Sequence, residues 1–338
     1  MKTIAELENF MTRPSSALIS DLKKIDGDIL ILGIGGKMGP TMAKMTKRAI
    51  DEAGLEKRVI GVSRFSSGNL RQELEENGIE TIAADLLDDH ALASLPEVKN
   101  IIYMAGNKFG TVGNEHFTWA MNAYLPGRLA EKFKNSRIVA FSTGNVYPLT
   151  NVLANGCSED TAVNPVGEYA QSCLGRERVL TYFSHKNNTQ MLLFRLNYAI
   201  DLRYGVLLEI AKNVNMGQEI DLTMGNVNVI WQGDANEYAI RSLLHTNTPP
   251  EILNVTGPET LSVRWVAEEF GKRLNKPVRF RGVESPQALL NNASKAHKLF
   301  GYPNISVQQM MDMIADWLMI DGETHNKPTH FQEREGAF

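Results

Sequence analysis

The chain has 338 residues, of which 43% are hydrophobic and 22% are charged, and its formal net charge at pH 7 is −4. This length and apolar content allow one large α/β unit or two domains with a substantial core, and they exclude a disordered protein. Because both charge signs are mixed throughout, there is no basic stripe for a phosphate backbone, which argues against nucleic acid as the main partner. Two cysteines are too few for a disulfide framework or a zinc cage.

The start of the chain bears on localisation and on the first helices. Its sequence, MKTIAELENFMTRPSSALISDLKK, has no apolar core of the signal-peptide kind, and no apolar run approaches the length that crosses a bilayer. We therefore expect a cytoplasmic protein with no membrane partner. Residues 1–26 are expected to form an N-terminal helical extension, in which Pro14 separates two short helices and Gly27 ends the second.

From residue 28 onward, short apolar runs alternate with stretches of helical length such as 38–53 and 114–134. Runs that are apolar on both faces are typical of a parallel sheet covered by helices. The pattern predicts repeated βαβ units, hence an α/β fold with a Rossmann-like, doubly wound parallel sheet. The predicted strands lie at 28–33, 58–63, 78–85, 100–106, 137–143 and 190–196.

After residue 195 the alternation weakens, which suggests a change of domain. We expect residues 27–195 to form an NAD(P)-binding Rossmann domain, completed by parts of 226–260. Residues 196–320 are expected to form mainly a smaller substrate-binding lobe over the carboxyl edge of the sheet, where ligands bind in such folds. Residues 321–338 are expected to form a loose polar tail.

The first predicted strand leads directly into a glycine-rich loop, GIGGKMG, that precedes a predicted helix. Glycines permit a tight turn and the close approach of a pyrophosphate, whose charge is met by free N–H groups at the helix N-terminus. The strand before the loop and the helix after it favour a dinucleotide site over a purely structural turn. The cofactor-binding residues expected here are Gly33, Gly35, Gly36, Lys37, Met38 and Gly39.

The end of the second predicted strand bears on the choice of dinucleotide. An acidic side chain there would accept hydrogen bonds from the adenine ribose of NAD, but the chain offers Ser63 and Arg64, with Lys37 in the glycine loop. These groups suit the 2′-phosphate of NADP, so NADP is the expected cofactor and NAD the second choice. The alternative is that Arg64 and Lys37 are solvated surface charges.

A series of motifs from about residue 28 to residue 318 resembles the extended short-chain dehydrogenase/reductases, the group of NAD-dependent epimerases and dehydratases. GIGGKMG is similar to the family's GxxGxxG, and ADLLD, YMAGNKFG, AMNAYLPGRL and FSTGNVYP resemble its later motifs. The segments VNVIWQGDANEYAI and EILNVTGPETLSVRWVAEEF resemble its C-terminal signatures. The resemblance implies further cofactor-site residues, namely Asp85, Leu86, Met104, Ala105, Gly106, Lys108, Asn122 and Tyr169.

The stretch EYAQSCLGRE resembles the helix that carries the family's YxxxK motif. The resemblance makes Tyr169 the general acid/base and Thr143 the hydroxyl that binds the reacting oxygen. Asn145 and Asn197 are expected to contact the substrate. Cys173 stands at the lysine position, and we predict that it is a small buried side chain rather than a nucleophile.

The missing lysine matters for the chemistry. A tyrosine titrates near pH 10 in water and needs a nearby positive charge to act at neutral pH. A thiol cannot supply that charge. Another cation has to fill in, and the candidates are Lys108, Arg176 and the positive ring of an oxidised nicotinamide.

Two functions follow from these features. The first is an enzyme, an NAD(P)-dependent oxidoreductase or epimerase/dehydratase of carbohydrate metabolism that transfers hydride at a carbohydrate-like hydroxyl or carbonyl. The alternative is a catalytically impaired NADP-binding protein with a sensing, scaffolding or regulatory role. Because the family's sugar-nucleotide enzymes carry an arginine near the position of Val227, a free sugar or sugar acid fits as well as a nucleotide sugar. The resemblance implies a homodimer, and the scattered histidines predict no metal site.

Overall fold

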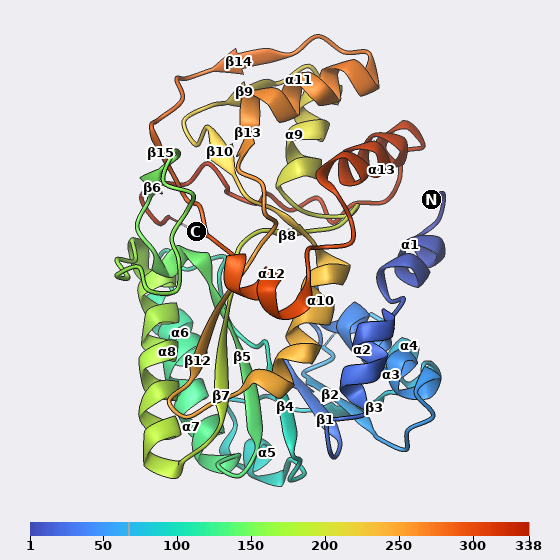
Figure 1. Ribbon diagram of the computed structural model, residues 1–338, viewed down its shortest axis with the longest axis vertical. Coiled ribbons are helices and arrows are strands. Elements are labelled where there is room, and N and C mark those ends of the chain that lie inside the picture. The colour runs from blue at the N-terminus through green and yellow to red at the C-terminus, as the bar shows by residue number, and fades with distance from the viewer. Residues whose placement is uncertain (67, 338) are drawn as a thin grey trace.

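The centre of the protein is a parallel sheet of seven strands, in the order β12-β7-β5-β4-β1-β2-β3 (Figure 1). This computed structural model describes residues 1–66 and 68–337, and position 338 of the predicted tail lies outside them. Every predicted strand is present, and the seventh, β12, pairs in parallel with β7. The predicted doubly wound α/β fold is confirmed. The strands are β1 (Ile29–Leu32), β2 (Val59–Ser63), β3 (Glu80–Ala83), β4 (Asn100–Tyr103), β5 (Arg137–Thr143), β7 (Met191–Leu196) and β12 (Glu251–Val255).

Both faces of the sheet are buried. Ile29 and Ile31 of β1 pack into the core on one face, whereas Leu30 and Leu32 pack into the core on the other. This two-sided burial explains why the strands are continuous apolar runs. The helices on the first face include α2 (Ser16–Leu22), α3 (Gly39–Glu52), α4 (Leu70–Glu76) and α10 (Gln232–Arg241). Those on the second include α5 (Asp89–Ser94), α7 (Leu125–Lys132) and α8 (Gly167–Asn187).

A smaller lobe lies at the carboxyl end of the strands, at the top of Figure 1. Its helices are α9 (Val206–Asn215), α11 (Val263–Leu274) and α13 (Val307–Met319), whose buried side chains share one core. Short strand pairs complete the lobe and its junction with the sheet, namely β8 (Ala199–Ile200) with β11 (Ile230–Trp231), β9 (Glu219–Asp221) with β14 (Arg279–Arg281), β10 (Asn226–Val227) with β13 (Leu261–Ser262) and β6 (Thr150–Asn151) with β15 (Gln287–Ala288). The remaining α-helices are α1 (Ile4–Met11), α6 (Glu115–Trp119) and α12 (Ser294–Phe300). Among the described residues, none of the helices combines the length and apolar character needed to span a lipid bilayer.

The N-terminal extension is divided between the two parts of the fold. Leu7 and Met11 of α1 belong to the core of the C-terminal lobe, whereas Leu18 and Leu22 of α2 belong to the core of the sheet. The extension therefore connects the lobe to the sheet instead of lying on one of them.

Glu8 of α1 reinforces this connection with two ion pairs. Its carboxylate lies 2.6 Å from Nζ of Lys44 in α3 and 3.1 Å from a guanidinium nitrogen of Arg203, in the segment before α9. Burial by itself raises the pKa of Glu8, but the hydrogen bonds and charges of Lys44 and Arg203 outweigh it and leave the pKa below the ordinary value of 4.5.

Replacing Glu8 with glutamine is expected to lower the free energy of unfolding by about 1–3 kcal/mol at pH 7, because two buried cations lose a charged partner. Since the folded pKa of Glu8 lies below 4.5, its contribution is complete above that value and disappears as the pH falls through the folded pKa. Urea unfolding at pH 7 and in acid should show a difference between the two proteins that shrinks in acid. The control is Glu6→Gln, which makes the same change at an exposed residue of the same helix. An equal difference at both pH values would contradict the charge argument.

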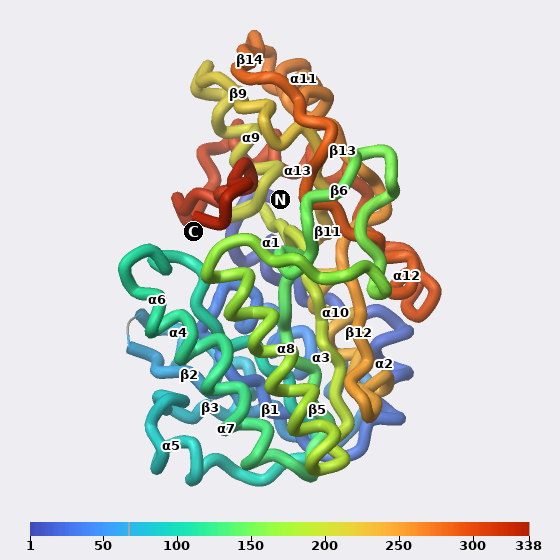
Figure 2. The backbone as a smooth tube through the Cα atoms, turned by 90° about the vertical axis from the view of Figure 1, so that its left-hand side faces the viewer, coloured from blue at the N-terminus to red at the C-terminus, as the bar shows by residue number. Residues whose placement is uncertain are grey.

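The C-terminal tail is packed and not loose, which corrects the expectation drawn from its polar composition. The Thr329 N–H donates to Glu209 at 2.6 Å, and Phe331 is buried in the core of the lobe. Arg334 donates to the carbonyl oxygen of Gln287 at 2.9 Å. Figure 2 shows the tail, in dark red, between the lobe and the upper ends of α6 and α8. A few anchoring side chains hold residues 321–337, which have no regular secondary structure.

Candidate active site

A cavity of about 590 Å³ lies between the carboxyl edge of the sheet and the C-terminal lobe. Its walls come from the glycine loop, the ends of β4 and β5, the start of α8, the segments that follow β7 and the tail. The expected site residues that line it are Gly33, Gly36, Lys37, Met38, Met104, Gly106, Lys108, Asn122, Thr143, Asn145, Tyr169 and Asn197. The other expected residues, Gly35, Gly39, Ser63, Arg64, Asp85, Leu86, Ala105 and Cys173, are not among its lining.

The glycine loop fits the pyrophosphate of a dinucleotide. Gly33 has a φ of +89°, and a Cβ there would lie 2.6 Å from the backbone nitrogen of Ala105, so the two loops approach as only glycine allows. Helix α3 begins at Gly39, directly after the loop, and its N-cap residue Met38 makes no side-chain capping bond. The N–H groups of its first turn are therefore suited to an anion in the cavity.

Four residues expected near the adenosine part of the cofactor lie outside the cavity, at the ends of the neighbouring strands β2 and β3. Ser63 ends β2 beside the glycine loop, because a Cβ on Gly35 would meet its Oγ at 2.5 Å. Arg64 and Asp85 are exposed, whereas Leu86 is buried in the core beneath α5 and α7. Ser63 and Arg64 thus lie at the end of β2, the position that is expected to determine the choice between NAD and NADP.

The Lys37 side chain contacts the C-terminal lobe in this structure, and its expected role at a 2′-phosphate stays a prediction. Its Nζ lies 3.0 Å from the centre of the Tyr204 ring, in the segment that leads into α9. Burial, together with the charges of Lys327 and Lys108, lowers the pKa of Lys37 to about 7. Its ammonium group is therefore directed at the C-terminal lobe, where an anionic ligand would stabilise its charge.

Tyr169 and Thr143 meet at the wall of the cavity. The Tyr169 hydroxyl is hydrogen-bonded to the Thr143 side chain, and the Thr143 hydroxyl donates to Oδ1 of Asn145 at 3.0 Å. Burial raises the pKa of Tyr169 well above its ordinary value of 10.0. β5 positions Thr143 and α8 positions Tyr169, so both hydroxyls belong to rigid elements.

Cys173 lies one helical turn from Tyr169 and is not among the residues that line the cavity. It is 1% exposed and packs with Val146, Tyr147 and Cys157. Burial raises the pKa of its thiol, which keeps the thiol neutral. Among the residues that the structure describes, no three His, Cys, Asp or Glu side chains gather as a possible metal site.

Asn122 lies in a single π-helical turn, Ala120–Tyr124, between α6 and α7. Its Nδ2 donates to the carbonyl oxygen of Asn107 at 2.7 Å and to Oγ of Ser172 at 3.0 Å. Such turns are often found at functional sites. Here the turn fastens the loop after β4 to α8, which fixes one wall of the cavity.

Asn197 offers the cavity an amide group. The residue is 2% exposed, and its Nδ2 has no hydrogen-bond partner among the residues described. A buried unpaired donor is costly unless a ligand or water satisfies it. The placement of Asn197 therefore fits its expected role toward a ligand.

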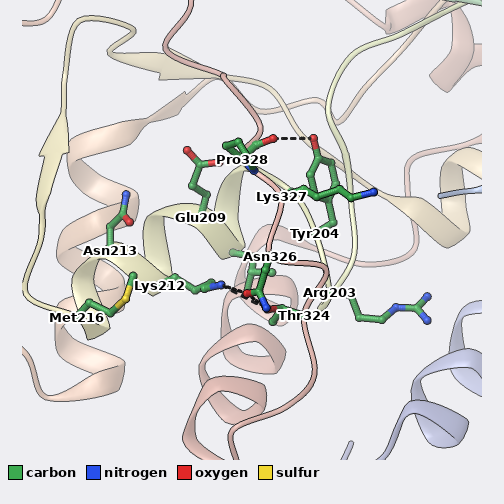
Figure 3. Close-up of a pocket in the computed structure, with 12 residues that line it drawn as sticks. Arg203, Tyr204, Glu209, Lys212, Asn213, Met216, Thr324, Asn326, Lys327 and Pro328 are labelled. Atoms are coloured by element: carbon green, nitrogen blue, oxygen red, sulfur yellow. Dashed lines mark hydrogen bonds between the residues drawn. The ribbon is translucent and has the colours of Figure 1, made fainter. Parts of the chain in front are cut away.

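Two residues of the tail, Lys327 and Thr329, also line the cavity, and no pattern in the sequence indicates this. The tail also borders a smaller hollow of about 270 Å³ beside α9, where Lys212 donates to Oδ1 of Asn326 at 2.7 Å (Figure 3). Because Lys327 and Thr329 belong to no periodic pattern or motif, only the fold reveals their position at the cavity.

Three of the solved structures that share this fold are each 17% identical to this chain. UDP-glucuronic acid 4-epimerase from Bacillus cereus is 17% identical, with a TM-score of 0.72 over 86% of this chain and 99% of that one. DesIV, a dTDP-glucose 4,6-dehydratase from Streptomyces venezuelae, is 17% identical, with a TM-score of 0.72 over 86% and 97%. Pal from Bacillus thuringiensis is 17% identical, with a TM-score of 0.70 over 86% and 99%.

At 17% identity these structural similarities show the fold alone, so membership of a family has to come from the sequence. A search of curated proteins found no match. The model of the NAD dependent epimerase/dehydratase family matches residues 29–223, more than half of the chain and the part that contains the glycine loop, Thr143 and Tyr169. The protein belongs to the NAD dependent epimerase/dehydratase family.

Proposed function

We propose that the protein is a nicotinamide-dependent enzyme that oxidises or reduces a carbohydrate-like hydroxyl or carbonyl group, as a net reaction or within an epimerisation or dehydration. The observation that carries this proposal is the meeting of the Thr143 and Tyr169 hydroxyls at a cavity bordered by the glycine loop. A bound nicotinamide cofactor supplies the acceptor or donor of hydride.

In this proposal the protein's own groups handle the reacting oxygen. Thr143 donates a hydrogen bond to that oxygen. During oxidation the deprotonated hydroxyl of Tyr169 takes the substrate's hydroxyl proton as the carbonyl forms, and during reduction the protonated hydroxyl returns a proton to the carbonyl oxygen. Asn197 and Asn145 bind neighbouring hydroxyls of the same substrate, which fixes the carbon that reacts.

The proposed substrate is a sugar, a sugar acid or a nucleotide sugar. The B. cereus and S. venezuelae neighbours are named for UDP- and dTDP-linked sugars. Val227, near the position expected of a diphosphate-binding arginine, is fully buried in β10. This favours a small carbohydrate in the cavity that the tail borders.

The test is a fluorescence titration with NAD(H) and NADP(H), followed by incubation with a panel of sugars, sugar acids and nucleotide sugars. Because epimerisation and dehydration leave the cofactor unchanged overall, products should be followed by mass spectrometry and NMR as well as by nicotinamide absorbance. Turnover of any member supports the proposal. Tight cofactor binding without turnover across the panel would instead support the second candidate, a cofactor-binding protein that has lost hydride transfer. The neutral Cys173 favours that candidate.

The preference for NADP over NAD stays a proposal supported by Ser63 and Arg64. If Arg64 binds a 2′-phosphate, Arg64→Ala should weaken NADP binding about 10-fold and leave NAD binding nearly unchanged, since a charge-assisted contact is lost only with NADP. Paired titrations of the two cofactors measure the difference. Arg71→Ala, an exposed arginine on α4, is the control. Equal losses for NAD and NADP would remove the 2′-phosphate assignment.

The homodimer and the cytoplasmic location also stay predictions. Tyr124 and Tyr182, each 61% exposed, lie at the start of α7 and on α8. Exposed aromatic side chains on adjacent helices support pairing of two copies at this face.

A further inference from the structure

The proposed proton transfer requires a positive charge near Tyr169. Burial raises the pKa of this tyrosine, so the fold alone makes its ionisation harder than in water. The nearest side chain on the same helix face, Cys173, is a buried neutral thiol. A proton acceptor at this position therefore depends on a cation that another residue provides.

Arg176 reaches this place from one turn farther along α8. Residues 169, 173 and 176 are spaced i, i+4 and i+7, so their side chains share one face of the helix. Arg176 is 5% exposed and still lines the cavity. Its charge acts on Tyr169 and on Cys173, lowering the pKa of each against the effect of burial.

Fixed acceptors orient the guanidinium group. Nη1 donates to the carbonyl oxygen of Phe141 at 2.6 Å, and Nη2 donates to Oδ1 of Asn122 at 2.8 Å. These acceptors are uncharged, and no carboxylate of residues 1–66 and 68–337 forms an ion pair with Arg176. The neighbouring Glu177 pairs with Arg195 instead. The positive charge of Arg176 is thus held in place without being neutralised.

Gly106 leaves the space that this group occupies. A Cβ on Gly106 would lie 2.6 Å from Nη2 of Arg176 and 3.0 Å from Oδ1 of Asn122. Gly106 follows β4 next to Ala105, the residue that the glycine loop approaches. The guanidinium therefore lies at the cavity wall between the glycine loop and Tyr169.

Lys108 is a second cation close to Tyr169, with its Nζ 5.4 Å from the centre of the tyrosine ring. Burial lowers the pKa of Lys108 to about 8. Its charge is therefore lost over the alkaline range, whereas a guanidinium keeps its charge at every pH that the protein tolerates. Of the two groups, Arg176 provides the charge that does not depend on pH.

We propose that Arg176 is the positioning residue that replaces the missing cation at Tyr169, supplying from the i+7 position the charge that Cys173 at i+4 cannot supply. This inference rests on the proposed function, in which Tyr169 exchanges a proton with the substrate. Loss of the charge should raise the pKa of Tyr169 and move the pH dependence of turnover in the same direction.

The experiment measures the ionisation of Tyr169 directly. A fluorinated tyrosine, whose hydroxyl is more acidic, is incorporated at position 169, and its ¹⁹F shift is followed against pH in the protein without ligand. Arg176→Gln should raise the pKa by about 1–3 units. Arg178→Gln, which removes the same charge from an exposed residue of α8, should leave it unchanged. Cys173→Lys in the Arg176→Gln background should return the pKa toward that of the wild type.

Gly106→Ala provides a second route if Arg176→Gln does not fold. Its Cβ would displace the guanidinium without deleting it, so the pKa of Tyr169 should again rise. An unchanged pKa in either folded variant overturns the proposal. Since this titration needs no turnover, an inactive wild-type protein would refute the proposed function and not the role of Arg176. Where turnover is found, Lys108→Gln distinguishes the two cations, because only Arg176→Gln should shift the pH profile on the alkaline side.

Discussion

Replacing Tyr169 with phenylalanine is expected to lower kcat by about 10²–10⁴-fold, the usual contribution of a positioned general acid or base. The substitution removes only the hydroxyl, while the ring keeps its packing against the cluster that contains Val146 and Cys173. Thr143 loses a hydrogen-bond partner but retains Asn145. Cofactor affinity should therefore change little, so the loss falls on the chemical step.

The matched control is Tyr182→Phe, which removes a hydroxyl from a 61% exposed tyrosine of the same helix. Its kcat should equal that of the wild type. Steady-state kinetics on a substrate found in the panel, with a parallel NADH titration, separates catalysis from binding. If Tyr169→Phe keeps a tenth or more of the wild-type kcat, another group performs the proton transfer.

Replacing Glu177 with alanine is expected to destabilise the fold by about 3–5 kcal/mol, because it leaves a buried arginine without its counter-charge. The side chains of Glu177 and Arg195 are each 4% exposed, and they are joined by hydrogen bonds of 2.6 Å and 2.9 Å. Glu177 also accepts a hydrogen bond from Ser142 at 2.6 Å. The pair therefore connects α8 to β5 and β7 directly beneath the site.

Urea unfolding measures this loss, and two further variants identify its cause. Glu131→Gln removes one member of the exposed pair between Glu131 and Lys186 and should cost less than about 1 kcal/mol. Replacing Glu177 and Arg195 together with methionine should cost less than Glu177→Ala alone, because no unpaired charge remains. A loss below 1 kcal/mol for Glu177→Ala would show that Arg195 finds another partner or reaches water.

The strands could be predicted because each is an apolar run with polar or glycine ends. The apolar run at 137–143, for example, predicts the fifth strand, and β5 spans these residues. The glycine loop was equally accessible, since its spacing and its flanking elements are local features of the sequence. Local patterns of this kind carry the layered fold and the approximate position of the site.

Contacts between distant residues were not accessible in this way. The spacing from Tyr169 places Arg176 on the correct helix face, but its acceptors lie 35 and 54 positions away, at Phe141 and Asn122. The direction of Lys37 depends on Tyr204, which belongs to the other lobe. No periodic pattern in the sequence predicts such long-range contacts, because they form only when the whole chain has folded.

The divided N-terminal extension has a consequence for the order of folding. Leu7 and Met11 share a core with Val307 and Trp317 of α13, so α1 packs against a helix that is synthesised much later. During translation the sheet can assemble through β12 while the apolar face of α1 still lacks its site. Contacts of such long sequence separation form slowly, and hydrophobic surface stays exposed until they have formed. Closure of the lobe around α1 is thus expected to be the final step, and the one most open to aggregation.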